Sequence, residues 1–194
     1  MKTLPDYLAT GLEIVSVGLN PSLRSVQAGF YFANPRNRFW RALERSGLAP
    51  GLPPPGPAAL CALLHEHRIG FTDVVKRPTA GGAELRARDF RHWAPVLEEK
   101  LLHYRPAIVW FHGKVAYRNF LRYTRTEVMD VAWGEQPRGI GPSVVFVSPN
   151  PSPANAAFGL DEIIKWYAAL SRLRRAAGSD RGSRDHSHGA TNKA

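Results

Sequence analysis

Short runs of apolar residues alternate along this chain with longer segments in which apolar residues recur every three or four positions. The runs are typical of strands buried on both faces of a parallel sheet, and the longer segments are typical of helices with one buried face. We expect strands at residues 14–17, 69–75, 107–111 and 144–147, and helices at residues 37–45, 58–67, 84–104, 114–123 and 161–177. This alternation predicts a three-layer α/β/α sandwich with a short, mainly parallel central sheet.

Residues that end or bend elements refine this outline. Gly47 is expected to stop the first helix, and Pro95 is expected to kink or break the third. Residues 129–136 fit either an edge strand or a loop. The last residues lack periodicity and are rich in Gly, Ser and Arg, which predicts a flexible basic tail at 178–194 after a single domain at 1–177.

A polar turn, Gly18-Leu19-Asn20-Pro21-Ser22, follows the first predicted strand. The glycine lets the backbone turn or approach a ligand closely, and Pro21 pushes Asn20 toward an extended conformation. The carboxyl ends of strands are where open α/β sheets place their ligands. Asn20 would therefore present its amide to a ligand from a rigid mount. The alternative is that Asn20 only stabilises the turn through local hydrogen bonds.

A second proline-stiffened turn, Ser148-Pro149-Asn150-Pro151-Ser152-Pro153, follows the last predicted strand. Two such turns after two buried strands can face one another across one cleft. An aromatic cluster with turn residues on both sides, Gly29-Phe30-Tyr31-Phe32-Ala33-Asn34-Pro35, lies between them in the sequence. We expect the three segments to form one binding site.

These segments are similar to those of the mismatch-specific uracil/thymine DNA glycosylases, one branch of the uracil-DNA glycosylase superfamily. The resemblance spans about residues 10 to 172 and keeps the motifs in the family's order. It is carried by Val17-Gly18-Leu19-Asn20-Pro21-Ser22, by Gly29 to Trp40, by Phe71-Thr72-Asp73-Val74-Val75-Lys76-Arg77-Pro78-Thr79 and by Asn150-Pro151-Ser152. The stretch from Gly29 to Trp40 is the most specific of them. The family's fold is the same sandwich.

The resemblance implies that Asn20 positions the attacking water through its side-chain oxygen, and that Phe32 stacks on the extruded base. An amide orients water without deprotonating it well, so a site with Asn20 alone should be slow. The alternative for Phe32 is a purely structural ring. The base pocket is expected to contain Gly18, Leu19, Ser22, Phe32 and Asn150, with backbone N–H groups around Leu19, Ser22 and Phe32 reading the base edge.

Asp73 departs from the family pattern, in which the matching residue is uncharged or basic. A carboxylate near the sugar could act as a general base, or it could stabilise the developing cation. The alternative is a surface or capping aspartate paired with Lys76 or Arg77.

The stretch from Asn150 to Phe158 resembles the loop that enters the duplex and fills the gap left by the extruded base. Its expected DNA contacts are Ser152, Pro153, Ala154 and Asn155. Ala154 is too small to fill the space of a nucleotide. We therefore predict weaker reading of the opposite guanine and looser mismatch specificity.

The net charge of +10 points to a polyanionic partner, and nucleic acid is the first candidate. Solvated surface charge is the alternative for every basic side chain. The candidates for phosphate contacts are Arg36, Arg38, Lys76, Arg77 and Lys114.

Composition limits the remaining classes of function. Hydrophobic residues make up 44% of the 194, as in an ordinary soluble domain, and no apolar run could span a bilayer or form a secretory signal. The single cysteine, Cys61, excludes an internal disulfide and a cysteine-based cluster, and its apolar neighbours predict that it is buried. The histidines lack metal-ligand spacing. We expect no metal and no cofactor, and an intracellular, cytoplasmic location with association with the nucleoid.

These features together predict a monofunctional DNA glycosylase that removes uracil in base excision repair, with thymine and modified pyrimidines as further candidate substrates. Its partners would be double-stranded DNA with a mismatched or damaged pyrimidine and single-stranded DNA, and it would act as a monomer. No lysine sits in an evident Schiff-base setting, so no strand cleavage is expected. The alternatives are a catalytically silent nucleic-acid-binding module on the same fold and a small-molecule hydrolase.

Overall fold

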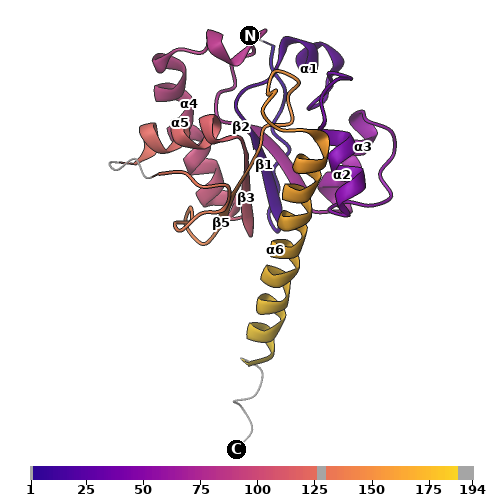
Figure 1. The fold of residues 1–194 in the computed structure, drawn as a ribbon. Coiled ribbons are helices and arrows are strands. Elements are labelled where there is room, and N and C mark those ends of the chain that lie inside the picture. The colour runs from indigo at the N-terminus through magenta and orange to yellow at the C-terminus, as the bar shows by residue number, and fades with distance from the viewer. Residues whose placement is uncertain (1, 126–129, 188–194) are drawn as a thin grey trace, which may run out of the picture.

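A five-stranded sheet forms the centre of the molecule in the computed structural model, which describes residues 2–125 and 130–187, with side chains as far as residue 178 (Figure 1). The strand order is β2-β1-β3-β5-β4, and all neighbours run parallel except β4, which is antiparallel to β5. The strands are β1 (Ile14–Gly18), β2 (Ile69–Asp73), β3 (Ile108–His112), β4 (Gly134–Glu135) and β5 (Val144–Ser148).

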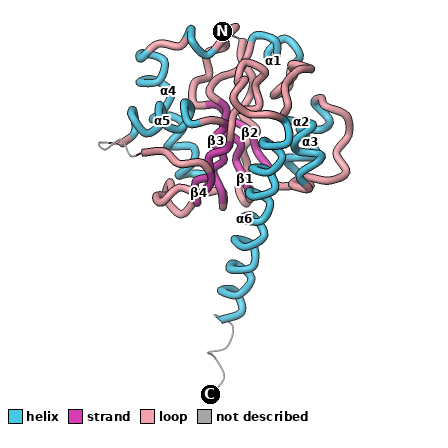
Figure 2. The backbone as a smooth tube through the Cα atoms, viewed as in Figure 1, coloured by secondary structure: helices cyan, strands magenta, loops and turns pink. Residues whose placement is uncertain are grey.

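Helices cover both faces of this sheet (Figure 2). They are α1 (Leu23–Ala28), α2 (Phe39–Ser46), α3 (Pro57–His65), α4 (Ala87–Tyr104), α5 (Lys114–Thr124) and α6 (Leu160–Ser187), with a short 3₁₀ helix at Gly82–Glu84. The α4 and α5 helices pack on one face, and α2, α3 and α6 pack on the other. The predicted three-layer α/β/α sandwich is confirmed.

Alternation along each strand divides the core into two layers. Val109 and Phe111 of β3 join the cluster under α4 and α5, whereas Ile108 and Trp110 join the cluster under α2, α3 and α6. Successive side chains of a strand point to opposite faces, so a strand covered on both sides has to be apolar throughout. This is why the continuous apolar runs of the sequence became the central strands.

The N-terminal segment lies along the outer edge of β2. Tyr7 exchanges two backbone hydrogen bonds of 2.9 Å with Phe71. A Cβ atom on Gly70 would lie 2.3 Å from the backbone oxygen of Tyr7, so only glycine permits this approach. The segment therefore becomes part of the sheet edge and brings Asp6 next to the end of β2.

Several boundaries differ from the sequence predictions. Helix α1 was not expected; it is one short segment capped by the Ser22 side chain, which accepts from the Ser25 backbone. Helix α4 passes through Pro95 without the early break, because its apolar face is held by the core. Helix α6 continues to Ser187 rather than ending at Ala177, and extends beyond the body of the molecule (Figure 1).

Cys61 is exposed, so the prediction that it is buried was wrong. Helix α3 turns Leu60 and Leu63 into the core and Cys61 away from it. Residues 134–135 form the edge strand that was one of two expected possibilities, while Met129 lies outside the described residues. Gly47 ends α2, as predicted, and the structure shows it in the left-handed conformation.

Candidate active site

A cavity of about 220 Å³ opens where the parallel strands end. The turns after β1, β2 and β5 and the last residue of β3 contribute to its wall, because the carboxyl ends of parallel strands meet at one edge of a sheet. All seven residues predicted for catalysis or base binding line it: Gly18, Leu19, Asn20, Ser22, Phe32, Asp73 and Asn150.

The Asn20 amide is held in one orientation. Its Nδ2 donates to the hydroxyl of Thr79 at 2.7 Å and to the backbone oxygen of Arg77 at 3.1 Å. The Thr79 hydroxyl gives its own proton to the backbone oxygen of Gly81 at 2.9 Å, so toward Asn20 it can only accept. The backbone oxygen of Pro21 is a third acceptor, 3.2 Å from Nδ2, so a flipped amide would set Oδ1 against three acceptors. The amide nitrogen is therefore anchored, and Oδ1 is the atom left for a ligand in the cavity.

The Asp73 carboxylate is buried at the end of β2, with 4% of the residue exposed. Its Oδ2 lies 3.2 Å from the Lys76 ammonium. Burial raises the pKa of the Asp73 carboxyl from 3.8 to about 6, against the opposing effect of Lys76. The alternative that Asp73 lies at the surface is therefore wrong. The pairing with Lys76, which was part of that alternative, is present. A base with this pKa is ionised at neutral pH and can still take up a proton.

Phe32 forms an aromatic wall of the cavity. Phe39 covers one face of its ring, with centroids 4.0 Å apart and planes 14° apart. The contacts of the ring with His112 and Phe71 are T-shaped. Phe32 has a positive φ of 57°, which costs about 1–2 kcal/mol for a residue with a Cβ atom. The aromatic core under the ring holds it in this conformation. Stacking of the ring on a base stays a prediction.

His112 is a cavity residue that sequence reasoning did not assign. It is the last residue of β3 and is 2% exposed, and its Nε2 lies 2.8 Å from the hydroxyl of Ser16. Burial lowers the pKa of His112 to about 3, so the ring is neutral in the folded protein. The only signal in the sequence was its place after an apolar run, which Asn20 and Asp73 share.

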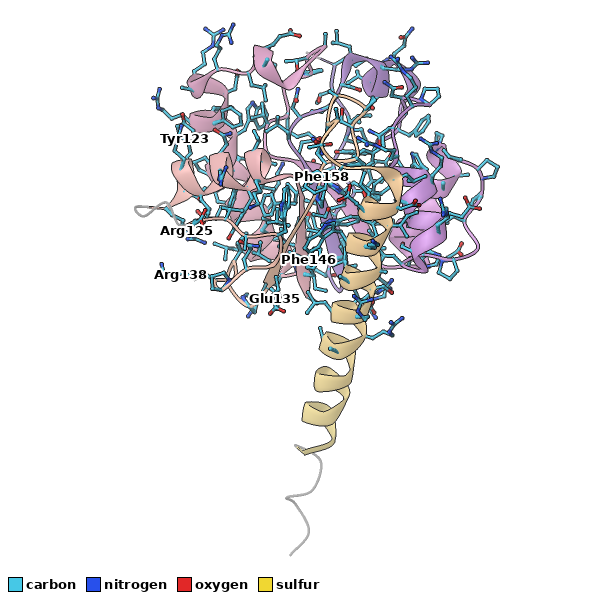
Figure 3. The ribbon with its side chains drawn as sticks, viewed as in Figure 1. Tyr123, Arg125, Glu135, Arg138, Phe146 and Phe158 are labelled. Carbon is cyan, nitrogen blue, oxygen red and sulfur yellow. The ribbon has the colours of Figure 1, made fainter. Side chains whose placement is uncertain are left out.

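The loop after β5 is held by Arg38, which stands just before α2. Its guanidinium donates to four backbone oxygens of the loop, those of Pro151, Ser152, Asn155 and Phe158. Nη2 lies 2.8 Å from the oxygen of Asn155, and Nε lies 3.2 Å from the oxygen of Pro151. Phe158, labelled in Figure 3, then packs edge-on against Trp133. Four of the five N–H donors of Arg38 are used within the protein, an arrangement that does not favour the predicted phosphate contact.

The predicted DNA contacts fall into two groups. Ser152 and Ala154 line the cavity, while Pro153 and Asn155 lie on the same loop outside the lining. The Asn150 side chain accepts from the Ser152 backbone at 2.9 Å and so shapes this loop.

The basic residues are placed differently from one another. Lys76 is buried, so its predicted phosphate contact is wrong. Arg77 donates to both carboxylate oxygens of Asp89 at 2.8 Å, an arrangement that does not favour a phosphate contact. Arg36 is exposed, and the Lys114 ammonium lies 4.8 Å from the centre of the Trp133 ring; for both, phosphate contact stays a prediction.

Among the described residues, no three His, Cys, Asp or Glu side chains gather into a group that could hold a metal ion. The polar groups at the cavity include an anchored amide, a buried carboxylate and a neutral imidazole. Such a set can orient a water molecule and take a proton from it.

The comparison with known families decides where this site belongs. The model of the uracil DNA glycosylase superfamily matches residues 5–171, which include every cavity residue except Leu4. The chain belongs to the uracil DNA glycosylase superfamily.

One solved structure similar to this superfamily member comes from Methanosarcina acetivorans and was determined by solution NMR. That protein is provisionally designated a uracil DNA glycosylase; 24% of residues are identical, and the match covers 89% of this chain and 97% of the other with a TM-score of 0.59. At this identity the likeness establishes a shared fold. Separately, none of the described helices is both long and apolar enough to cross a membrane.

Proposed function

We propose that this superfamily member is a monofunctional DNA glycosylase that excises uracil from mismatched or single-stranded DNA. Thymine and modified pyrimidines are further substrates of the same proposed pocket. The observation that carries the proposal is the anchored Asn20 amide, whose Oδ1 is left for the cavity that Asp73 and Phe32 also line. The cavity is smaller than the roughly 300–1,000 Å³ of sites for drug-sized ligands. Its size suits a single base.

The reaction follows from the roles available to these groups. An enzyme that acts on a stacked base extrudes the nucleotide into a pocket. There Asn20 Oδ1 accepts a hydrogen bond from a water molecule, and the Asp73 carboxylate takes a proton from it. The water oxygen bonds to C1′ of the sugar as the bond from C1′ to the base nitrogen breaks. The base leaves with the electron pair of that bond and is then protonated, and an abasic site remains.

Two features support DNA as the partner. The net charge of +10 favours a polyanion, and the loop held by Arg38 lies at the mouth of the cavity with Pro153 and Ala154 exposed. A small, stiff tip of this kind fills the gap in the duplex poorly. We therefore propose that the enzyme prefers G·U over A·U pairs by less than about tenfold, which corresponds to less than about 1.4 kcal/mol.

The test uses labelled oligonucleotides that carry uracil in G·U, A·U and single-stranded contexts, and thymine in G·T. Strand breaks are expected only after alkali treatment, since the proposed reaction leaves an intact abasic strand. Asp73→Asn should lower the single-turnover excision rate by about 10²–10⁴-fold, the usual contribution of a general base. Asp161→Asn, at an exposed carboxylate on α6, is the matched control and should keep the wild-type rate.

Other results would contradict specific parts of the proposal. Tight DNA binding without base release from any substrate would favour a silent binding module. Breaks without alkali would contradict the monofunctional reaction. An unchanged rate in folded Asp73→Asn would remove Asp73 from the mechanism, and a wild-type rate in Asn20→Ala would do the same for Asn20.

A further inference from the structure

A buried ammonium group lies between two carboxylates beside the cavity. Lys76 Nζ is 3.2 Å from Oδ2 of Asp73 and 2.8 Å from Oδ1 of Asp6. It also donates to the Tyr31 hydroxyl at 3.1 Å. The three protons of the ammonium thus meet three acceptors, and the closer of the two carboxylates is the one outside the active site.

Asp6 is itself held from several sides. Its Oδ1 accepts from the Thr72 hydroxyl at 2.8 Å, and its Oδ2 lies 2.7 Å from the Lys100 ammonium. Burial opposes the charge on Asp6, but Lys76 and Lys100 together hold its pKa below the usual value, so it is ionised at neutral pH.

The four charged groups form a line that leads from the cavity to the solvent. The exposed fraction of the side chain rises from 3% at Asp73 to 8% at Lys76, 18% at Asp6 and 33% at Lys100. Positive and negative groups alternate along it. Each group therefore changes the balance of charge felt by the next.

We propose that Asp6 is a positioning residue that draws Lys76 away from Asp73 and so keeps Asp73 able to accept a proton from the attacking water. This inference rests on the proposed glycosylase function. Loss of the Asp6 charge has three effects on Asp73. It leaves Lys76 to Asp73 alone, it removes a nearby negative charge, and it leaves Lys100 without its partner. All three favour the ionised carboxylate.

The other groups that face Asp73 do not reverse this direction. The Tyr31 hydroxyl is neutral, since burial raises its pKa well above 10. Across the cavity, His112 is neutral and Asn20 carries no charge. The charges that decide the protonation of Asp73 are therefore those of Lys76, Asp6 and Lys100.

The experiment measures single-turnover uracil excision against pH in Asp6→Asn. The acidic midpoint should fall by about one pH unit, the size expected from one nearby charge. At pH 5 the variant should then retain about five times the fraction of its plateau rate that the wild type retains. Asp130→Asn removes a carboxylate whose side chain is fully exposed, and its midpoint should not move.

Lys100→Gln provides a second variant at a more exposed site. Lys76 and Lys100 share the Asp6 carboxylate, so without Lys100 the carboxylate holds Lys76 more strongly. Asp73 then has less positive charge near it, and the acidic midpoint of excision should move upward. This opposite shift keeps the test available if Asp6→Asn does not fold. A role of Asp6 in folding alone would lower the melting temperature without moving either midpoint.

The titration of the Asp73 carboxyl carbon by ¹³C NMR, assigned with Asp73→Asn, gives a readout that does not depend on activity. Midpoints that stay within error of the wild type in both Asp6→Asn and Lys100→Gln would overturn the inference. A wild-type protein that excises no base from any substrate would overturn the proposed function instead, and the NMR titration would still test whether Asp6 acts on Asp73.

Discussion

A Cβ atom on Gly18 would lie 2.6 Å from Oδ1 of Asp73. The two residues are direct partners in the pairing of β1 with β2, and the buried carboxylate occupies the space that any other side chain would need. A glycine is thus needed at position 18 because Asp73, at the end of the neighbouring strand β2, leaves no room for a side chain.

Gly18→Ala should therefore displace the Asp73 carboxylate. A shift of about 1 Å in a reacting group can cost about 100-fold in rate, and we expect a loss of that size in the rate of uracil excision. Overpacking should also lower the free energy of unfolding by about 1–3 kcal/mol. Gly81→Ala is the matched control, because Gly81 lines the same cavity but has open space at its Cβ position. Equal rates for the two variants would contradict the prediction.

Thr79 should act on catalysis only through Asn20. Thr79→Val removes the 2.7 Å acceptor that orients the amide and keeps nearly the same volume. We expect kcat to fall about tenfold with little change in KM, because positioning is lost while the base pocket is kept. Thr79→Ser should restore the rate. Thr124→Val, which removes a hydroxyl on α5 outside the cavity, controls for the loss of a hydrogen bond. An equal loss in Thr79→Ser would show that the hydroxyl is not the cause.

The positions of the reacting groups could be predicted because parallel strands align their ends. Asn20, Asp73 and Asn150 each follow or end an apolar run, so an α/β sheet had to bring them to one edge. The same rule applied to His112, but a lone histidine without a ligand partner in the sequence gave no reason to choose it.

The contacts that hold those groups could not be predicted in the same way. Asp6 is 70 residues from Lys76 in the sequence, and Arg38 is more than 110 residues from the loop it holds. Tertiary packing determines their partners, and the spacing of residues along the sequence carries no information about such distant contacts. Lys76 shows the consequence: a lysine is placed at the surface by default, and only its two carboxylate partners make a buried position stable.

His112 should make the protein less stable in acid. Its pKa is about 3 in the folded protein and about 6.5 in an unfolded chain, so below pH 6.5 the unfolded chain binds a proton that the folded protein does not. The contribution of neutral His112 to the free energy of unfolding is therefore fully present above pH 6.5 and is lost as the pH falls toward 3. At pH 5 this amounts to about 2 kcal/mol.

His112→Gln should lack this loss when the free energy of unfolding in urea is compared at pH 7.5 and pH 5. Asp73 contributes in the opposite direction, because its raised pKa of about 6 makes the folded protein bind the extra proton; this contribution is shared by both proteins and cancels in the comparison. His92→Gln, at an exposed histidine on α4, should keep the wild-type dependence. If the free energy of unfolding changes equally between pH 7.5 and pH 5 in the wild type and in His112→Gln, His112 is not the source of the acid sensitivity.

Arg38 should matter more for duplex DNA than for single strands. Arg38→Lys keeps the positive charge but loses the planar fork that reaches four backbone oxygens of the loop. A less ordered loop cannot hold open the gap left by an extruded base, whereas a base in a single strand leaves no such gap. We expect excision from a G·U duplex to slow by about tenfold, equivalent to about 1.4 kcal/mol, with a smaller change for single-stranded uracil. Arg91→Lys, at an exposed site on α4, keeps the same charge and should leave both rates unchanged. If Arg38→Lys slows both substrates equally, Arg38 supports the cavity as a whole, and the loop has no separate role in opening the duplex.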